Sequence, residues 1–172
     1  MRTHDGQQPP AEAALVRQRR DAMIPRMGMR RAAELAARLT GTSFSEATWR
    51  AIENGRYTGP ADRIAAMAFV VGVTVQELEN CNRADAARIL HEELRRHAAA
   101  EPELAGVDPD ATPETVIQLL LRGLDQIRNA SGLSDGQKRA LEKSLMRSVQ
   151  QNLTGQLDQI RTTLAIVSGR AR

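Results

Sequence analysis

Residues 45–55 read Ser-Glu-Ala-Thr-Trp-Arg-Ala-Ile-Glu-Asn-Gly, and this stretch decides how the chain folds. The opening serine is a favourable N-cap residue, because its side-chain oxygen accepts from the unpaired N–H groups of a first helical turn. Trp49 and Ile52 are three residues apart and therefore share one face of a helix. The final glycine supplies a C-terminal stop. The stretch predicts a short helix over residues 46–54 with both apolar side chains facing a core.

On both sides of this stretch, apolar residues recur at the three- and four-residue spacing of helices, and no strand pattern competes. Proline, glycine and threonine positions set the expected helix ends. The helices expected in the N-terminal half cover residues 11–24, 29–39, 46–54, 61–71 and 75–79. A linker helix over residues 83–99 and an acidic, proline-containing linker over residues 101–111 follow.

The C-terminal part predicts a helical hairpin with one long helix. Its last helix, over residues 135–168, would be roughly 50 Å long at 1.5 Å per residue. The apolar stripe of that helix is longer than the preceding helix can cover, so we expect it to pair with a second copy of the chain. A hairpin that packs within one chain is the alternative. The predicted dimerisation residues are Leu120, Leu124, Leu141, Leu145, Val149, Leu153, Leu157, Ile160 and Leu164.

Composition indicates a mostly helical, soluble protein. Its 172 residues suffice for one ordinary domain or two small ones, and 41% of them are hydrophobic. Aromatic residues make up only 2%, which disfavours a β-sandwich. The single cysteine, Cys81, excludes a disulfide scaffold and fits a reducing cytoplasm. No apolar run approaches the roughly 20 residues that span a bilayer. We therefore expect a cytoplasmic, nucleoid-associated protein with no membrane partner.

The net charge of +3 conceals an uneven distribution. Residues 1–60 hold ten Arg against six acidic residues, whereas residues 61–112 hold five Arg against ten acidic residues. Residues 113–172 are again basic, with nine cations against five acidic residues. A basic segment beside an acidic one indicates a polarised surface. Chance clustering explains the charges equally well when they are taken alone.

Residues 11–79 resemble the XRE, or lambda-repressor-like, family of helix-turn-helix DNA-binding domains, in the form common among actinobacterial regulators. The resemblance is carried by Leu15-x-x-x-Arg19, Glu34-Leu35-Ala36, Trp49-x-x-Ile52-Glu53-Asn54-Gly55, and the run from Met67 to Thr74 that is followed by Glu77-Leu78. It implies a five-helix domain that binds double-stranded DNA and represses transcription. The chain departs from the family by about three extra residues, which we place at residues 40–43.

In such a domain the third helix enters the major groove and its N-terminal residues meet the base edges. With Trp49 and Ile52 inside, the residues left to read bases are Glu46, Ala47, Thr48, Arg50 and Ala51. Arg50 suits a guanine, through two hydrogen bonds to O6 and N7. An exposed ion pair between Glu46 and Arg50 is the simpler interpretation.

The resemblance also implies phosphate contacts and a structural ion pair. The family grips phosphates at the positions of Ser45, Asn54, Arg56 and Tyr57. Arg30 and Arg31, at the positive end of the second helix, suit the same role, although a solvated basic face explains Arg31 equally well. The resemblance further matches Arg19 and Glu53 to a buried pair that joins the first and third helices.

These patterns divide the chain into an arm, a reader, a linker and a dimerisation region, over residues 1–10, 11–80, 81–112 and 113–172. The expected partners are an operator with an inverted repeat and a second copy of the chain. Two other functions remain open. The chain is an antitoxin if its C-terminal helices bind a toxin, or a protein–protein adaptor if the fold has lost DNA binding.

No catalytic motif appears, so we expect no enzyme and no cofactor. His4, His91 and His97 lack partners at the spacing of metal ligands, and we expect no metal.

Overall fold

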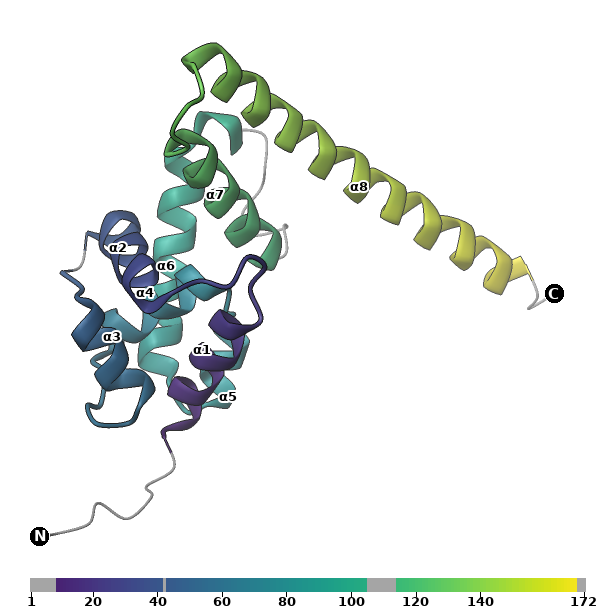
Figure 1. Ribbon diagram of the computed structural model, residues 1–172. Coiled ribbons are helices and arrows are strands. Elements are labelled where there is room, and N and C mark those ends of the chain that lie inside the picture. Colours follow the sequence, from purple (N-terminus) through teal and green to yellow (C-terminus); the bar gives the residue numbers. More distant parts are fainter. Residues whose placement is uncertain (1–8, 42, 105–113, 170–172) are drawn as a thin grey trace, which may run out of the picture. The chain divides into compact units, whose positions relative to one another are not determined.

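The computed structural model describes residues 9–41, 43–104 and 114–169, with only the helical backbone for residues 152–154 and 156–169 (Figure 1). Every regular element within these residues is helical, which confirms the all-α class. The chain divides into two compact units between residues 119 and 120. Residues 1–8 of the predicted arm and 105–112 of the predicted linker lie outside the described residues.

The first unit begins with five helices, whose ends agree with the sequence expectations to within a few residues. They are α1 (Ala11–Asp21), α2 (Met29–Thr40), α3 (Glu46–Glu53), α4 (Ala61–Val71) and α5 (Val75–Asn80). The longer α6 (Ala84–Ala100) and a short 3-10 helix, η1 (Pro102–Leu104), follow.

Helix α4 is the centre of this unit. All its residues from Ile64 to Val71 are buried, and it packs against α1, α2 and α6. Burial of each large apolar side chain here, such as Met67 or Phe69, contributes roughly 1.5–3 kcal/mol to the stability of the fold. Helix α3 in turn packs on α1 and α2, so the α4 core supports the elements that carry α3.

A tight connection joins α4 to α5. Gly72 ends α4 at a φ of 79°, a left-handed conformation that glycine adopts without strain. Thr74 then caps α5 as predicted: its hydroxyl accepts from Glu77 N at 3.2 Å, and Glu77 Oε2 accepts from Thr74 N at 2.9 Å. Partial burial raises the pKa of Glu77, but this backbone bond and Arg19 outweigh it and leave the pKa below its ordinary value.

The start of α7 (Glu114–Arg128) binds this same connection. The Glu114 carboxylate accepts from Val75 N at 3.1 Å, and Gln118 Nε2 donates to the Val73 carbonyl oxygen at 3.0 Å. Gln118 is 0% exposed. Burial raises the pKa of Glu114 above its ordinary value, although the bond from Val75 N opposes the shift. These contacts join the first residues of α7 to the N-terminal unit.

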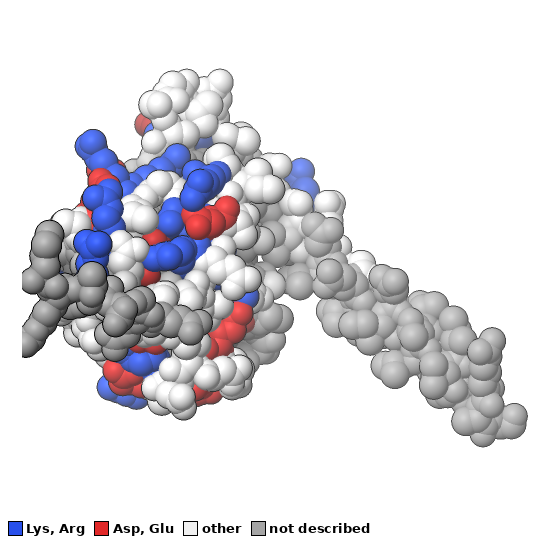
Figure 2. Space-filling view, turned by 60° about the horizontal axis from the view of Figure 1, so that its bottom comes forward, with Lys and Arg blue, Asp and Glu red and all other residues white. Residues whose placement is uncertain are grey.

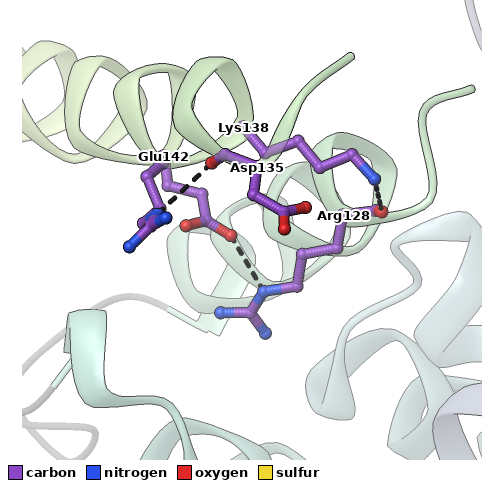
Figure 3. A pocket seen from close by; sticks show the side chains of 5 residues that line it. Arg128, Asp135, Lys138 and Glu142 are labelled. Carbon is purple, nitrogen blue, oxygen red and sulfur yellow. Dashed lines mark hydrogen bonds and ion pairs between the residues drawn. The ribbon is translucent and has the colours of Figure 1, made fainter. Parts of the chain in front are cut away.

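The second unit contains the rest of α7 and the long α8 (Asp135–Gly169). Gly123 lets the two helices approach closely, because a Cβ atom at this position would lie 2.8 Å from Leu145 Cδ2. Figure 3 shows the polar contacts near the turn, where Arg128 Nε donates to Glu142 Oε1 at 2.9 Å and Lys138 Nζ donates to the Arg128 carbonyl oxygen at 2.8 Å. The predicted hairpin contact is therefore made within one chain.

Candidate nucleic-acid interface

Helix α3 presents one anchored face and one open face. Ser45 caps it as predicted, since its Oγ accepts from Thr48 N at 3.1 Å. Trp49 and Ile52 are 0% and 2% exposed, respectively. The remaining side chains point outward to differing degrees: Ala47 and Arg50 are exposed, whereas Glu46, Thr48 and Ala51 are half-buried. All five residues predicted to read bases therefore lie on one helix, and each is at least partly exposed to solvent.

A buried polar network fixes the inner face of α3. Glu53 is 0% exposed and accepts from Arg20 Nε at 2.8 Å, from Arg20 Nη2 at 3.1 Å and from Trp49 Nε1 at 2.7 Å. Arg20 also donates to the Met27 carbonyl oxygen at 3.0 Å. The bonds to Glu53 raise the pKa of the Arg20 guanidinium above its ordinary value. The network ties α1 to α3.

The predicted pairing of Arg19 with Glu53 is therefore wrong by one residue. The buried face of α1 runs through Ala13, Val16 and Arg20, which cluster because a helix advances about 100° per residue. Arg19 lies about 100° away from Arg20 on that helix. It is exposed and pairs with Glu77 of α5.

Two of the predicted DNA-contacting arginines are held by carboxylates one helical turn away. Arg50 pairs with Glu46, and Arg30 pairs with Glu34 at 2.9 Å. The Arg50 and Arg30 side chains are 56% and 82% exposed, so solvent screens both pairs. The exposed Arg50 pair is worth roughly 0.2–0.5 kcal/mol, and a stronger acceptor displaces it easily.

The other predicted phosphate ligands follow α3 directly. Arg56 and Tyr57 are exposed, and both of their N–H groups donate to the Ala51 carbonyl oxygen, at 2.9 and 3.2 Å. Within the described residues, neither Arg56 nor the exposed Arg31 has an ion-pair partner. Gly55, at a φ of 67°, forms the turn before them.

Two further arginines lie near α3, and the sequence pattern does not single them out. Arg17 on α1 donates from Nη2 to Asn54 Oδ1 at 2.6 Å. Arg63 of α4 stacks over Phe44, with 5.9 Å between its Cζ and the ring centroid. Arg17 precedes Arg20 by three residues, so the correct register of α1 would have placed it beside the end of α3.

Positive side chains gather on the upper part of the face shown in Figure 2, with acidic side chains among them. On this face the two signs are intermingled, and no large patch of a single sign is visible. A surface of mixed charge attracts an anionic partner only where its arginines leave their carboxylate partners and bind the anion instead.

The predicted dimerisation residues fall into three groups. Leu120 and Leu124 are each 1% exposed in the single chain, so burial removes them from any surface between chains, and that part of the prediction is corrected. Leu141 is 44% exposed, and Leu145 and Val149 are half-buried. Leu153, Leu157, Ile160 and Leu164 lie within α8, but their side chains are outside the described residues.

The described residues offer little for other chemistry. Partial burial, with Glu12 and Glu77 nearby, raises the pKa of the Cys81 thiol, whereas a reactive cysteine needs a lowered pKa. No three His, Cys, Asp or Glu side chains of the described residues gather as metal ligands do. None of the helices searched within those residues is long and apolar enough to cross a membrane.

No protein-family profile, curated protein or solved structure matches this chain.

Proposed function

We propose that this chain is a sequence-specific regulator of transcription that binds double-stranded DNA. In this proposal α1 to α5 form a lambda-repressor-like domain, with α2 and α3 as its helix-turn-helix pair. The observation that carries the proposal is the division of α3 into two faces. Trp49, Ile52 and Glu53 are locked in the core, whereas Ala47, in the first turn, and Arg50, in the last turn, are exposed.

This division suits a helix that enters the major groove, which admits one α-helix and displays a distinct set of donors and acceptors for each base pair. Arg50 gains two hydrogen bonds to guanine O6 and N7 and gives up only its exposed pair with Glu46. A bidentate contact discriminates between bases by roughly 1–3 kcal/mol, more than such an exposed pair contributes. Glu46, once released, is free to accept from cytosine N4.

Phosphate contacts on both sides of the groove would set the orientation of α3. Arg30 and Arg31 lie in the first turn of α2, where the N–H groups of the helix end also favour an anion. Arg56 and Tyr57 lie beyond the C-terminal end of α3. These contacts position the helix and carry no base sequence themselves.

The C-terminal helices would join two copies of the chain, so that a second α3 helix reads a second half-site. Leu141, Leu145 and Val149 recur every four residues along α8. Leu145 also lies against Gly123 of α7, but none of the three is fully buried within the chain. Pairing two α8 helices would bury this stripe and relate two reading helices by a two-fold axis. Such a dimer binds inverted half-sites about one helical turn apart.

The experiment that tests the proposal is the selection of bound duplexes from a random pool by the full-length chain. We expect an inverted repeat to be enriched. Arg50→Ala should lose roughly 1–3 kcal/mol of affinity for the selected duplex and relax one position in each half-site. Arg56→Ala is the matched control on a phosphate and should weaken all duplexes alike. A pool without any enriched motif contradicts the proposal and leaves the antitoxin and adaptor functions.

A further inference from the structure

Arg17 makes an unusual contact with the last turn of α3. Its Nη2 donates to the Glu53 carbonyl oxygen and to Asn54 Oδ1, at 2.6 Å in each case. A carbonyl group at a helix C-terminus has no intrahelical partner, and the helix end carries a partial negative charge. The cation of Arg17 satisfies both needs and joins the end of α3 to α1.

The bond to Oδ1 holds the oxygen of the Asn54 amide and leaves its nitrogen free. A carboxamide has an oxygen that accepts hydrogen bonds and a nitrogen with two N–H donors, and the bond from Arg17 holds the oxygen. Among the described residues, nothing accepts from the Nδ2 donors, and Asn54 is exposed beside Arg56 and Tyr57. The side chain is therefore oriented as a donor toward solvent at the place where the proposed function puts a phosphate.

We infer that Arg17 is a positioning residue, which holds the Asn54 amide so that its N–H groups donate to a DNA phosphate. The inference rests on the proposed function and adds a residue to it. Without Arg17, the amide of Asn54 would rotate freely and present its oxygen to the phosphate as often as its nitrogen. The conformational entropy of the Asn54 side chain is thus already lost in the free protein, before DNA binds.

A direct contact between Arg17 and a phosphate is the competing role, since the Arg17 side chain is 39% exposed. The two roles differ in their salt dependence. A cation that neutralises a phosphate releases counterions and adds about 0.9 to the slope of log K against log salt. A neutral amide adds no charge to the interface, so a residue that acts through Asn54 leaves the slope unchanged.

The test is a double-mutant cycle on a duplex selected by the wild-type chain. Affinities of the wild type, Arg17→Met, Asn54→Ala and the double variant are measured by fluorescence anisotropy at several salt concentrations. We expect each single variant to bind about tenfold more weakly, the range of a hydrogen bond to a charged group. The double variant should bind no more weakly than Asn54→Ala, and the salt slope should be the same for all four.

Additive losses, or a slope that falls by about one unit with Arg17→Met, would overturn the positioning role. Arg19→Met is the matched control: this residue is also exposed on α1 but pairs with Glu77, and its loss should leave affinity unchanged.

Urea unfolding of the same four proteins separates the two proposals. A coupling between Arg17 and Asn54 in the free energy of unfolding would establish their bond without DNA. If the wild type then selected no duplex, the proposed function would fail and the phosphate role would fall with it. Absence of that coupling, with DNA binding intact, would contradict the inference alone.

Discussion

Helices α3 and α8 are both proposed to contact other molecules, yet they are held in opposite ways. Helix α3 has only eight residues, and an isolated helix of that length is unstable in water. Buried residues fix one of its faces, among them the charged Glu53. Helix α8 has 35 residues, and of its described side chains only Glu142 is buried. The short helix owes its structure to the core, whereas the long one leaves apolar side chains for a partner.

The largest effect should come from breaking the anchor of α3. Replacing Arg20 by Met removes two hydrogen bonds and the nearest cation from the buried Glu53 carboxyl group, which costs about 3–5 kcal/mol of unfolding free energy. Urea unfolding followed by the fluorescence of Trp49, the chain's one tryptophan and a neighbour of Glu53, measures this loss. The matched variant Arg19→Met removes an exposed pair and should cost less than about 1 kcal/mol. Equal losses of unfolding free energy in the two variants would contradict the assignment of the buried ion pair to Arg20.

A second comparison contrasts a buried leucine with an exposed one in the C-terminal unit. Leu124→Ala leaves a cavity where the side chain is 1% exposed, and we expect a loss of about 2–5 kcal/mol. Leu141→Ala, at a position 44% exposed, should change the stability of a single chain by less than about 1 kcal/mol. Helicity during urea unfolding at low protein concentration measures both.

A different substitution at Leu141 tests the dimer. Leu141→Asp should weaken self-association in sedimentation equilibrium, because it places a charge on the proposed seam between two α8 helices. Unchanged association with this variant would leave α8 to another partner or to solvent.

The smallest expected effect is a pH dependence at Glu114. Burial raises the pKa of Glu114 in the folded chain. At a pH between the ordinary and the raised pKa, the folded state therefore holds a proton that the unfolded state has released. The stability of the wild type relative to Glu114→Gln should therefore be greatest below the ordinary pKa of 4.5 and fall as the pH rises through the raised value. Denaturation of both proteins across this range measures the difference. An unchanged or opposite trend would contradict the burial of this carboxylate.

The elements that the sequence predicts well are those with local causes. Ser45, Thr74 and Gly72 set helix ends through bonds or dihedral angles within a few residues of themselves. The three-residue spacing of Trp49 and Ile52 predicts that both face the core, and both are buried.

The errors and omissions have non-local causes. Arg19 and Arg20 are equivalent in local pattern, and only packing against Glu53, 33 residues further on, distinguishes them. The same holds for Gln118, whose bond to Val73 spans 45 residues and has no counterpart in the helical periodicity of either segment. Burial of Leu120 and Leu124 likewise depends on tertiary packing, which an apolar stripe leaves undetermined.

The most direct test of the account is the base preference of Arg50. A selected duplex is prepared in four forms that differ only at the base pair assigned to this residue, and each is titrated with the wild type and with Arg50→Ala. The account predicts that the wild type prefers one pair by roughly 1–3 kcal/mol and that the variant binds all four alike. A variant that keeps the full preference of the wild type would show that α3 does not read DNA through Arg50.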